Sequence, residues 1–477
     1  MINLFRYIRI SWLWVMLLAA ISGCRKYLEV PLPLNSMPVS SAFENDITAA
    51  AALTSVYTVL AQQAILDGTD GLGSVTGLYT DELKLQNTLM SSDYVPIYSN
   101  GVSSSSKVVN YWATIYKQLY SVNTAIEGLK PATSLTYQHQ WLGEAYFLRG
   151  LFYFYLANIY GEVPLVVSTD YLANNVLARS PQADVYAQVV SDLRQAQSLL
   201  DNKYHDATGA VTTSRGRPNR AAATALLARA YLYMKDWKNA AAQADSLIGN
   251  TADFQLPDLS KAFLVNSKEV IWGLIPFGNS YPSYAVKDAT TYYLVPGLPI
   301  ASLTVVSTMS DALVVAFEPR DGRWPAWVGK DSLSPTEIYY YAYKYKVRDK
   351  QTPPQEIFAV LRLAEQYLVR AEAKAQQNDL TGALADLNAV RARAGLGAST
   401  AATQPDVLAA ILRERRVELF TETGHRFFDL RRTGKLDAVM NVAAPLKGGS
   451  WNSYMAWWPI PVREIQNDPH LVQTPGY

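Results

Sequence analysis

Residues 370–390 of the chain read RAEAKAQQNDLTGALADLNAV, and residues 228–248 read ARAYLYMKDWKNAAAQADSLI. The two stretches align with Ala230 over Ala373, Asp236 over Asp379 and Ala240 over Ala383. In each stretch, apolar residues recur at helical spacing on both sides of a short polar turn. The sequence therefore predicts the same unit twice, two helices joined by a short turn.

This internal repeat has the features of a tetratricopeptide helix pair. Tyr231 and Ala240 fit the spacing of that pattern, in which small residues let paired helices approach closely. A single Ala-rich hairpin can imitate the pattern by chance, and a second occurrence makes chance a weaker explanation. Because such pairs bury their apolar faces against neighbouring pairs, we expect a stacked helical scaffold.

Helical periodicity extends over much of the chain. It predicts helices at residues 42–66, 108–129, 139–160, 183–200, 220–234, 237–248, 357–377, 381–394 and 406–420. The expected fold is mainly all-α, a scaffold of tetratricopeptide-like helix pairs. Residues 67–107, 251–355 and 441–477 lack the helical period and are rich in Gly, Pro, Ser and aromatic residues. We expect them to be ordered, irregular segments that carry the binding site.

The composition argues against nucleic acid as a partner and favours a sugar. The 42 Lys and Arg are matched by 41 Asp and Glu, for a net charge of +1, whereas nucleic-acid-binding proteins usually have a basic stripe. The chain has 31 Tyr and 11 Trp, more rings than a helical core needs. Rings with a flat apolar face and a polar edge suit ligands that are wet but have apolar C–H surfaces.

The N-terminus predicts a lipoprotein signal peptide at residues 1–23. Two arginines precede an apolar run at residues 10–21, which is shorter than the roughly 17 to 25 residues of a membrane-spanning helix. Residues 21–24 read ISGC and look like a bacterial lipobox, in which Cys24, the only cysteine, receives a diacylglyceryl group and then an N-acyl chain. The alternative is an ordinary secretory signal with a cysteine nearby.

The chain carries no sequence signature of a zinc site, a phosphate loop or a serine-hydrolase elbow. Its 4 histidines are far apart, and none has a Cys, Asp or Glu at metal-ligand spacing. The stretch GTDGLGS at residues 68–74 lacks the spacing of a nucleotide-binding loop, and we expect a flexible turn there.

Two charged features of the sequence could have either a functional or a structural role. Asp81 and Glu82 form the acidic pair to consider for a glycosidase, but adjacent residues of an extended chain point to opposite sides, so we favour a turn. Residues 411–435 hold the densest charge, with Glu414 and Glu418 on one helix face and Arg415 at ion-pair spacing from Glu418. We expect a structural ion-pair network here. The alternative is an anionic-ligand site of Arg415, Arg416 and Arg426.

Several segments together resemble the SusD/RagB family, and they occur in that family's order over essentially the whole mature chain. They are GEAYFLRGLFYFYLANIYGEVPLV at 143–166, the two helix-pair segments at 217–248 and 361–395, ERRVELFTETGHRFFDLRRTGK at 414–435 and WWPIPVREIQNDPHLVQTPGY at 457–477. CRKYLEV at 24–30, FEPRDGRW at 317–324 and YYYAYKYKV at 339–347 also fit.

The resemblance implies a nutrient-binding lipoprotein on the outer face of the outer membrane, with one domain at residues 24–477. In this family the irregular segments, here notably 67–107 and 251–355, form the ligand face of a lid on a SusC-like TonB-dependent barrel. The lid captures a substrate, usually an oligosaccharide, and catalyses no reaction. No cofactor is expected besides the lipid on Cys24, and nothing in the sequence indicates calcium. Arg25 and Lys26 stand where surface lipoproteins often have an acidic run, which weakens the expectation of surface exposure.

The candidate ligand contacts lie in the irregular segments. We expect Trp324 and Tyr94 to stack on sugar rings, and Asp81 and Asn100 to bond hydroxyl groups. Further candidates are Tyr98, Trp327, Tyr292 and Tyr293. Each aromatic residue could instead be an ordinary packed or surface side chain. A peptide-binding protein of the same architecture and a surface glycoside hydrolase are the alternative functions.

Overall fold

The computed structural model describes residues 41–62, 65–86, 92–106, 111–277, 284–297, 307–334 and 337–477. Residues 43–477 form one compact unit. The predicted signal peptide, Cys24 and the predicted start of the domain lie outside the described residues. No helix within the described ranges is long and apolar enough to span a membrane.

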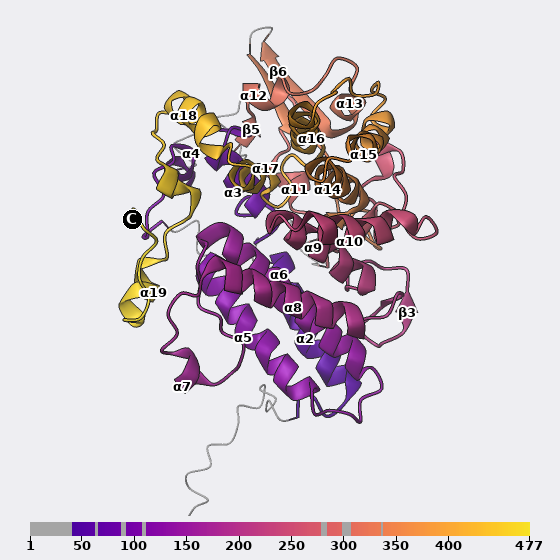
Figure 1. Cartoon of the computed structure of the whole chain (residues 1–477), viewed down its shortest axis with the longest axis vertical. Helices are drawn as coiled ribbons and strands as arrows, with labels where there is room; N and C mark the ends of the chain where they lie inside the picture. The colour runs from indigo at the N-terminus through magenta and orange to yellow at the C-terminus, as the bar shows by residue number, and fades with distance from the viewer. Residues whose placement is uncertain are drawn as a thin grey trace, which may run out of the picture. The chain divides into compact units, whose positions relative to one another are not determined.

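The described chain is predominantly helical, as predicted (Figure 1). The longer helices are α2 (Asp46–Gln62), α3 (Leu72–Tyr79), α5 (Tyr111–Leu129), α6 (Gln138–Tyr160), α8 (Gln182–Leu199), α9 (Arg220–Tyr233), α10 (Trp237–Gly249), α14 (Leu363–Gln376), α15 (Leu380–Arg393), α16 (Gln404–Glu418), α17 (His425–Arg432) and α18 (Leu436–Leu446). Short helices are α4 (Val95–Tyr98), α7 (Tyr171–Asn174), α11 (Asp288–Thr291), α12 (Asp311–Val314), α13 (Arg323–Trp327) and α19 (Val462–Asn467).

The long helices pack in series. Helix α6 contacts α5 on one side and α8 on the other, α8 contacts α9, α9 contacts α10, and α10 contacts α14, which packs on α15 and α16 (Figure 1). Every residue of α6 from Gln140 onward is buried, because a helix that is apolar on all sides needs neighbours on all sides. The predicted stack of helix pairs is confirmed.

The two copies of the internal repeat share their backbone conformation as well as their sequence pattern. Asp236 and Asp379 begin the second helix of their pairs with the same backbone angles, φ −83° and ψ 75°. The residues before them, Lys235 and Asn378, both adopt the left-handed conformation, at φ 61° and 67°. Each aspartate accepts a hydrogen bond from the backbone N–H three residues on, at Asn239 and Gly382, so each acts as an N-cap.

The strands pair only as short antiparallel ribbons in the described part of the chain. β1 (Leu83–Leu85) pairs with β5 (Ser307–Met309), β2 (Tyr204–His205) with β3 (Val211–Thr212), β4 (Val270–Leu274) with β8 (Phe358–Arg362), and β6 (Val328–Ser334) with β7 (Glu337–Ala342). Most of them lie in the two regions predicted to be irregular and to carry the ligand face. The described parts of these regions are therefore ordered, as expected, but less irregular than predicted.

Three local predictions need correction. The helix predicted at 357–377 begins only at Leu363, because Phe358–Arg362 pair with β4; a short apolar run cannot be assigned by periodicity alone. The turn predicted at 68–74 becomes helix α3 from Leu72 onward, and Gly73 is needed there because a Cβ would lie 1.9 Å from the backbone oxygen of Thr421. The region predicted to be irregular after 440 continues α18 as far as Leu446.

Candidate ligand-binding site

Trp324 lies in a half-exposed aromatic cluster, here called the Trp324 cluster. Its ring is 5.3 Å from that of Phe317 and 5.0 Å from that of Tyr340, between centroids. Phe317 also meets the buried ring of Phe420 edge-on at 5.7 Å. The cluster thus has one side in the core and one side accessible, as a stacking surface for a sugar ring requires.

Trp327 belongs to the interior instead. Its side chain is 1% exposed, its indole N–H donates to the carbonyl of Leu259 at 3.0 Å, and its ring meets Phe263. The cations of Lys344 and Arg393 lie 5.1 and 5.4 Å from its ring. The geometry therefore argues against the predicted ligand contact for Trp327. Although it lies only three residues after Trp324 on the same short helix, its side chain points into the core.

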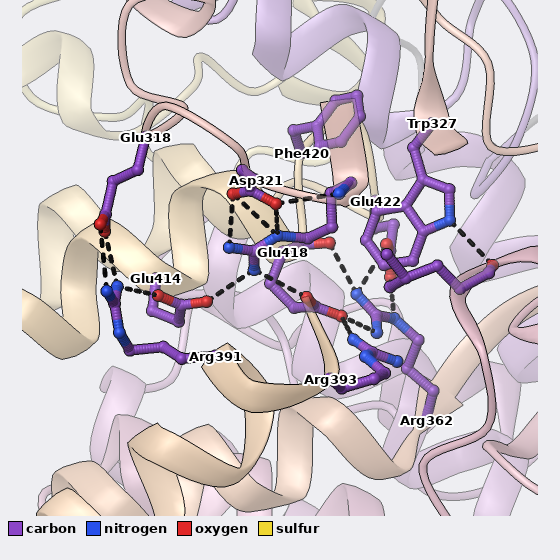
Figure 2. Close-up of polar contacts among 12 residues, drawn as sticks. Glu318, Asp321, Trp327, Arg362, Arg391, Arg393, Glu414, Glu418, Phe420 and Glu422 are labelled. Carbon is purple, nitrogen blue, oxygen red and sulfur yellow. Dashed lines mark hydrogen bonds and ion pairs between the residues drawn. The ribbon is translucent and has the colours of Figure 1, made fainter. Parts of the chain in front are cut away.

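A buried ion-pair network holds the segment that carries Trp324 (Figure 2). Arg323 is fully buried and donates to Asp321, to Glu414 at 2.6 Å and to Glu418 at 2.9 Å. Glu418 also accepts from Arg362 at 2.6 Å and from Arg393. Burial alone would raise the pKa of Glu418, but the charges of Arg393, Arg362 and Arg323 outweigh burial and lower it well below its usual value.

The structural interpretation of residues 411–435 agrees with this geometry, although the partners differ from those predicted. Arg415 does not pair with Glu418 on its own helix; its guanidinium donates to Asp429 at 2.7 Å. Arg416 and Arg426 both hold the carboxylate of Asp81, at 2.9 and 2.8 Å. Each of these arginines pairs with an aspartate, which argues against the alternative anionic-ligand site, although Nη1 of Arg415 and Nε of Arg416 have no hydrogen-bond partner in the described chain.

Asp81 and Asn100 are structural groups by geometry. Burial would raise the pKa of Asp81, but the hydrogen bonds and charges of Arg426, with the charge of Arg416, lower it. Asn100 is 2% exposed, and its side-chain N–H donates to the carbonyl of Tyr79 at 2.7 Å. Its left-handed backbone, φ 59°, suits an asparagine in a tight turn. Neither predicted contact to a sugar hydroxyl is supported by this placement.

Tyr94 directly precedes helix α4, Tyr98 is its last residue, and both side chains are half-buried. The hydroxyl of Tyr94 donates to Asp70 at 2.5 Å. Tyr98 lies with its ring centroid 5.3 Å from the ammonium of Lys447. That ammonium also donates to the carbonyls of three consecutive residues, Leu78, Tyr79 and Thr80, at 2.9 to 3.0 Å, so it caps the C-terminal end of α3.

Tyr292 is 2% exposed and lies in the core, whereas Tyr293 belongs to a second aromatic set, here called the tyrosine cluster. This cluster consists of Tyr293, Tyr339, Tyr341 and Tyr343 around the buried Leu294. Its rings meet at 5.6 Å between Tyr293 and Tyr341 and at 6.2 Å between Tyr293 and Tyr343. The burial of Tyr292 argues against the ligand contact predicted for it.

Strand β7 separates the two clusters. Tyr340 contacts Trp324, while the next residue, Tyr341, contacts Tyr293. Successive side chains of a strand point to opposite faces. The structure thus divides the predicted contacts: Trp324 lies on one face of the β6–β7 hairpin and Tyr293 on the other.

The described residues contain hollows but no metal cluster. A cleft of about 390 Å³ is lined by Thr133, residues 135–140, Leu199, Asp201 and His205. A much smaller hollow of about 20 Å³ is lined by Asp67 and Lys287 among others. No group of three or more His, Cys, Asp or Glu in the described ranges is placed to hold a metal ion.

Comparison with known proteins agrees with this architecture. Residues 26–232 match a family described as starch-binding and associating with the outer membrane, and residues 329–477 match the SusD family. The chain belongs to the SusD/RagB family. SusD-like protein P38 of Formosa agariphila is 24% identical over 99% of both chains, and the starch-binding protein SusD of Bacteroides thetaiotaomicron is 34% identical over 31% of this chain and 26% of its own.

Solved structures of other SusD proteins share the fold. A SusD superfamily protein of Bacteroides vulgatus superposes with a TM-score of 0.76 at 23% identity, over 91% of this chain and all of its own. A structure described as a laminarin-binding SusD-like protein superposes with a TM-score of 0.75 at 24% identity, with the same coverage. Structural similarity at this level of identity establishes the fold alone. The ligand contacts of this SusD-family member have to be inferred from its own residues.

Sequence reasoning missed several residues of the candidate site. Phe317 and Tyr340 support Trp324, Asp70 holds Tyr94, and Lys447 holds the chain beside Tyr98. The motif YYYAYKYKV was noticed only as part of the family resemblance. Its alternating tyrosines could have been assigned to two faces if a strand had been predicted there.

Proposed function

We propose that this SusD-family protein is a surface lipoprotein that binds an oligosaccharide and acts as the lid of a TonB-dependent outer-membrane transporter. The observation that carries the ligand part is the Trp324 cluster, a half-exposed aromatic surface fixed from below by the fully buried Arg323. A rigid ring loses little conformational freedom when a sugar stacks on it. The family descriptions, with starch binding and outer-membrane association, support the same ligand class.

The test of ligand binding uses the chain from residue 25 onward, which contains the whole compact unit. It is titrated against starch and laminarin oligosaccharides and a wider glycan panel. Trp324→Ala and Tyr94→Ala should weaken binding about tenfold or more if stacking contributes as aromatic anchors usually do. Tyr171→Ala is the matched control, because Tyr171 is 70% exposed on α7 and should leave affinity unchanged.

Other outcomes separate the alternative functions. If the protein binds a peptide and no glycan, the proposed architecture still holds but the ligand is a peptide instead of an oligosaccharide. Release of reducing sugar from a polysaccharide, abolished by one carboxylate substitution, would indicate a glycoside hydrolase.

The lipoprotein and partner proposals have their own tests. Radiolabelled fatty acid should be incorporated by the natural chain and not by Cys24→Ala, because the thiol is the attachment point. The lipidated protein should co-purify with a large β-barrel after mild detergent extraction. Protease accessibility in whole cells would report whether it faces the exterior. We also propose that the protein catalyses no reaction.

A further inference from the structure

Arg348 lies over the ring of a tyrosine of the tyrosine cluster. Its guanidinium carbon is 3.5 Å from the ring centroid of Tyr293. Two residues earlier, the ammonium of Lys346 lies 5.5 Å from the ring centroid of Tyr343. Both cations therefore sit on rings of the same cluster, and the accessible group on this face of Tyr293 is a guanidinium instead of a bare ring.

The guanidinium of Arg348 has no hydrogen-bond or carboxylate partner among the residues that the structure describes. Three other arginines of the described chain share this property, and all three are exposed: Arg320, Arg413 and Arg463. Arg348 alone of the four is half-buried. A partly desolvated guanidinium with unused donors is costly unless a partner binds it, so its environment is suited to an incoming anion.

The sequence of the undescribed internal stretches offers no carboxylate as a missing partner. The internal stretches that the structure leaves undescribed, residues 63–64, 87–91, 107–110, 278–283, 298–306 and 335–336, contain no Asp or Glu. No ion pair joins Arg348 to its exposed neighbour Asp349 in the described chain.

The acids of the adjoining hairpin are engaged elsewhere. Asp331 is 6% exposed and accepts from the backbone N–H groups of Gly297 and Ser332, at 3.3 and 2.9 Å. Glu337 accepts from the hydroxyl of Tyr339 at 2.8 Å. No ion pair joins either carboxylate to the guanidinium in the described chain, and the second carboxylate oxygen of Asp331 has no hydrogen-bond partner there.

A stacked arginine is suited to anions that present two oxygens side by side. The ring holds one face of the guanidinium, and the N–H groups at its edge remain free to donate in parallel to two oxygens of one carboxylate or sulfate. We propose that Arg348, on the ring of Tyr293 and beside Lys346, binds the carboxylate or sulfate of an acidic glycan. This inference rests on the proposed function and narrows its substrate class to anionic polysaccharides.

The experiment compares matched anionic and neutral ligands by calorimetric titration of the chain from residue 25 onward. One pair is polygalacturonate oligosaccharide and its carboxyl-reduced form; the other is chondroitin sulfate oligosaccharide and its desulfated form. We expect at least one anionic member to bind about tenfold more tightly than its neutral partner, since hydrogen bonds to charged groups contribute about that factor. The pair that shows the difference identifies carboxylate or sulfate as the recognised group.

Variants assign the effect to Arg348. Arg348→Gln should lose about tenfold in affinity for the anionic ligand and leave the affinity for the neutral one within about twofold. Arg348→Lys should restore part of it, because charge remains while the planar fork is lost. Arg463→Gln removes the same charge from an exposed, unpaired arginine on α19 and should change nothing. Unchanged thermal unfolding of each variant shows that the fold is retained.

The outcomes distinguish this inference from the function on which it rests. Equal affinity for the members of each pair, or full anionic binding by Arg348→Gln, overturns the inference; loss of glycan binding in Trp324→Ala would then still uphold the proposed function. If the natural chain binds no glycan in any panel, the proposed function fails and the inference fails with it.

Discussion

Arg323 and Glu414 form an ion pair of 2.6 Å in the core, with both side chains almost completely removed from water. They come from segments far apart in the sequence, helix α13 and helix α16. The residue after Arg323 is Trp324, the centre of the half-exposed aromatic cluster. The ion pair therefore joins the proposed ligand surface to the helical scaffold. A mutation that breaks the pair should affect both the stability of the scaffold and ligand binding.

Replacement of Arg323 by methionine should lower the free energy of unfolding by about 3 to 5 kcal/mol, because removal of one partner leaves buried carboxylates uncompensated. Urea denaturation of the natural and variant chains measures the difference. Arg413→Met, an exposed arginine on the same α16 helix, should stay within about 0.5 kcal/mol. A loss below about 1 kcal/mol in Arg323→Met would show that the network is not needed for stability.

Two tryptophans of helix α13 should separate binding from folding. Trp327→Ala should cost about 3 to 5 kcal/mol of stability, because a fully packed ring leaves a large cavity. Trp324→Ala should cost less, since part of its ring is already exposed, and should mainly reduce glycan affinity. Thermal unfolding and titration of both variants check this, and equal stability losses would contradict the assignment of Trp324 to the surface.

A buried carboxyl should make the stability of the fold fall as the pH rises from about 4.5 to about 7. Burial raises the pKa of Glu82 to about 7, although Arg426 and Arg416 oppose the rise. The folded chain therefore binds more protons than the unfolded one between pH 4.5 and 7. This contribution is fully present below pH 4.5, and about 3 kcal/mol of it is lost by about pH 8.

Denaturation curves at several pH values measure this slope, which Glu82→Gln should reduce. Burial likewise raises the pKa of Asp67 to about 6, so Asp67→Asn combined with Glu82→Gln should flatten the curve further. Glu44→Gln, at an exposed site, serves as the control. A slope that is unchanged in the double variant would show that these carboxyls are ionised in the fold.

The equivalent caps of the two helix pairs should contribute equally. Asp236→Ala and Asp379→Ala should each lower the free energy of unfolding by about 1 kcal/mol, the usual cost of losing an N-cap. Asp184→Ala removes an acid from the first turn of α8, where the N-cap is Pro181, and should cost less. Strongly unequal losses for Asp236 and Asp379 would mean that the two caps share a backbone geometry but contribute differently to stability.

Local features were predictable from the sequence because local interactions produce them. The helix periods, the aspartate caps and the turn between paired helices all depend on residues within a few positions of one another. For the same reason the sequence alone predicts the repeat at 228–248 and 370–390, and the matching backbone angles agree with it. The lipobox at Cys24 is equally local, and it remains a prediction.

Partners and exposure could not be read from the chain. Spacing along helix α16 suggested that Glu418 would pair with Arg415, yet the carboxylate binds Arg323, Arg362 and Arg393 from three other segments. Trp324 and Trp327 are equally aromatic and nearly adjacent, but only the packing of α13 against the core places one at the surface and buries the other. The sequence by itself determined the stacked helical scaffold. Tertiary packing decided which rings and charges remain available to a ligand, because burial and long-range pairing depend on how distant segments meet.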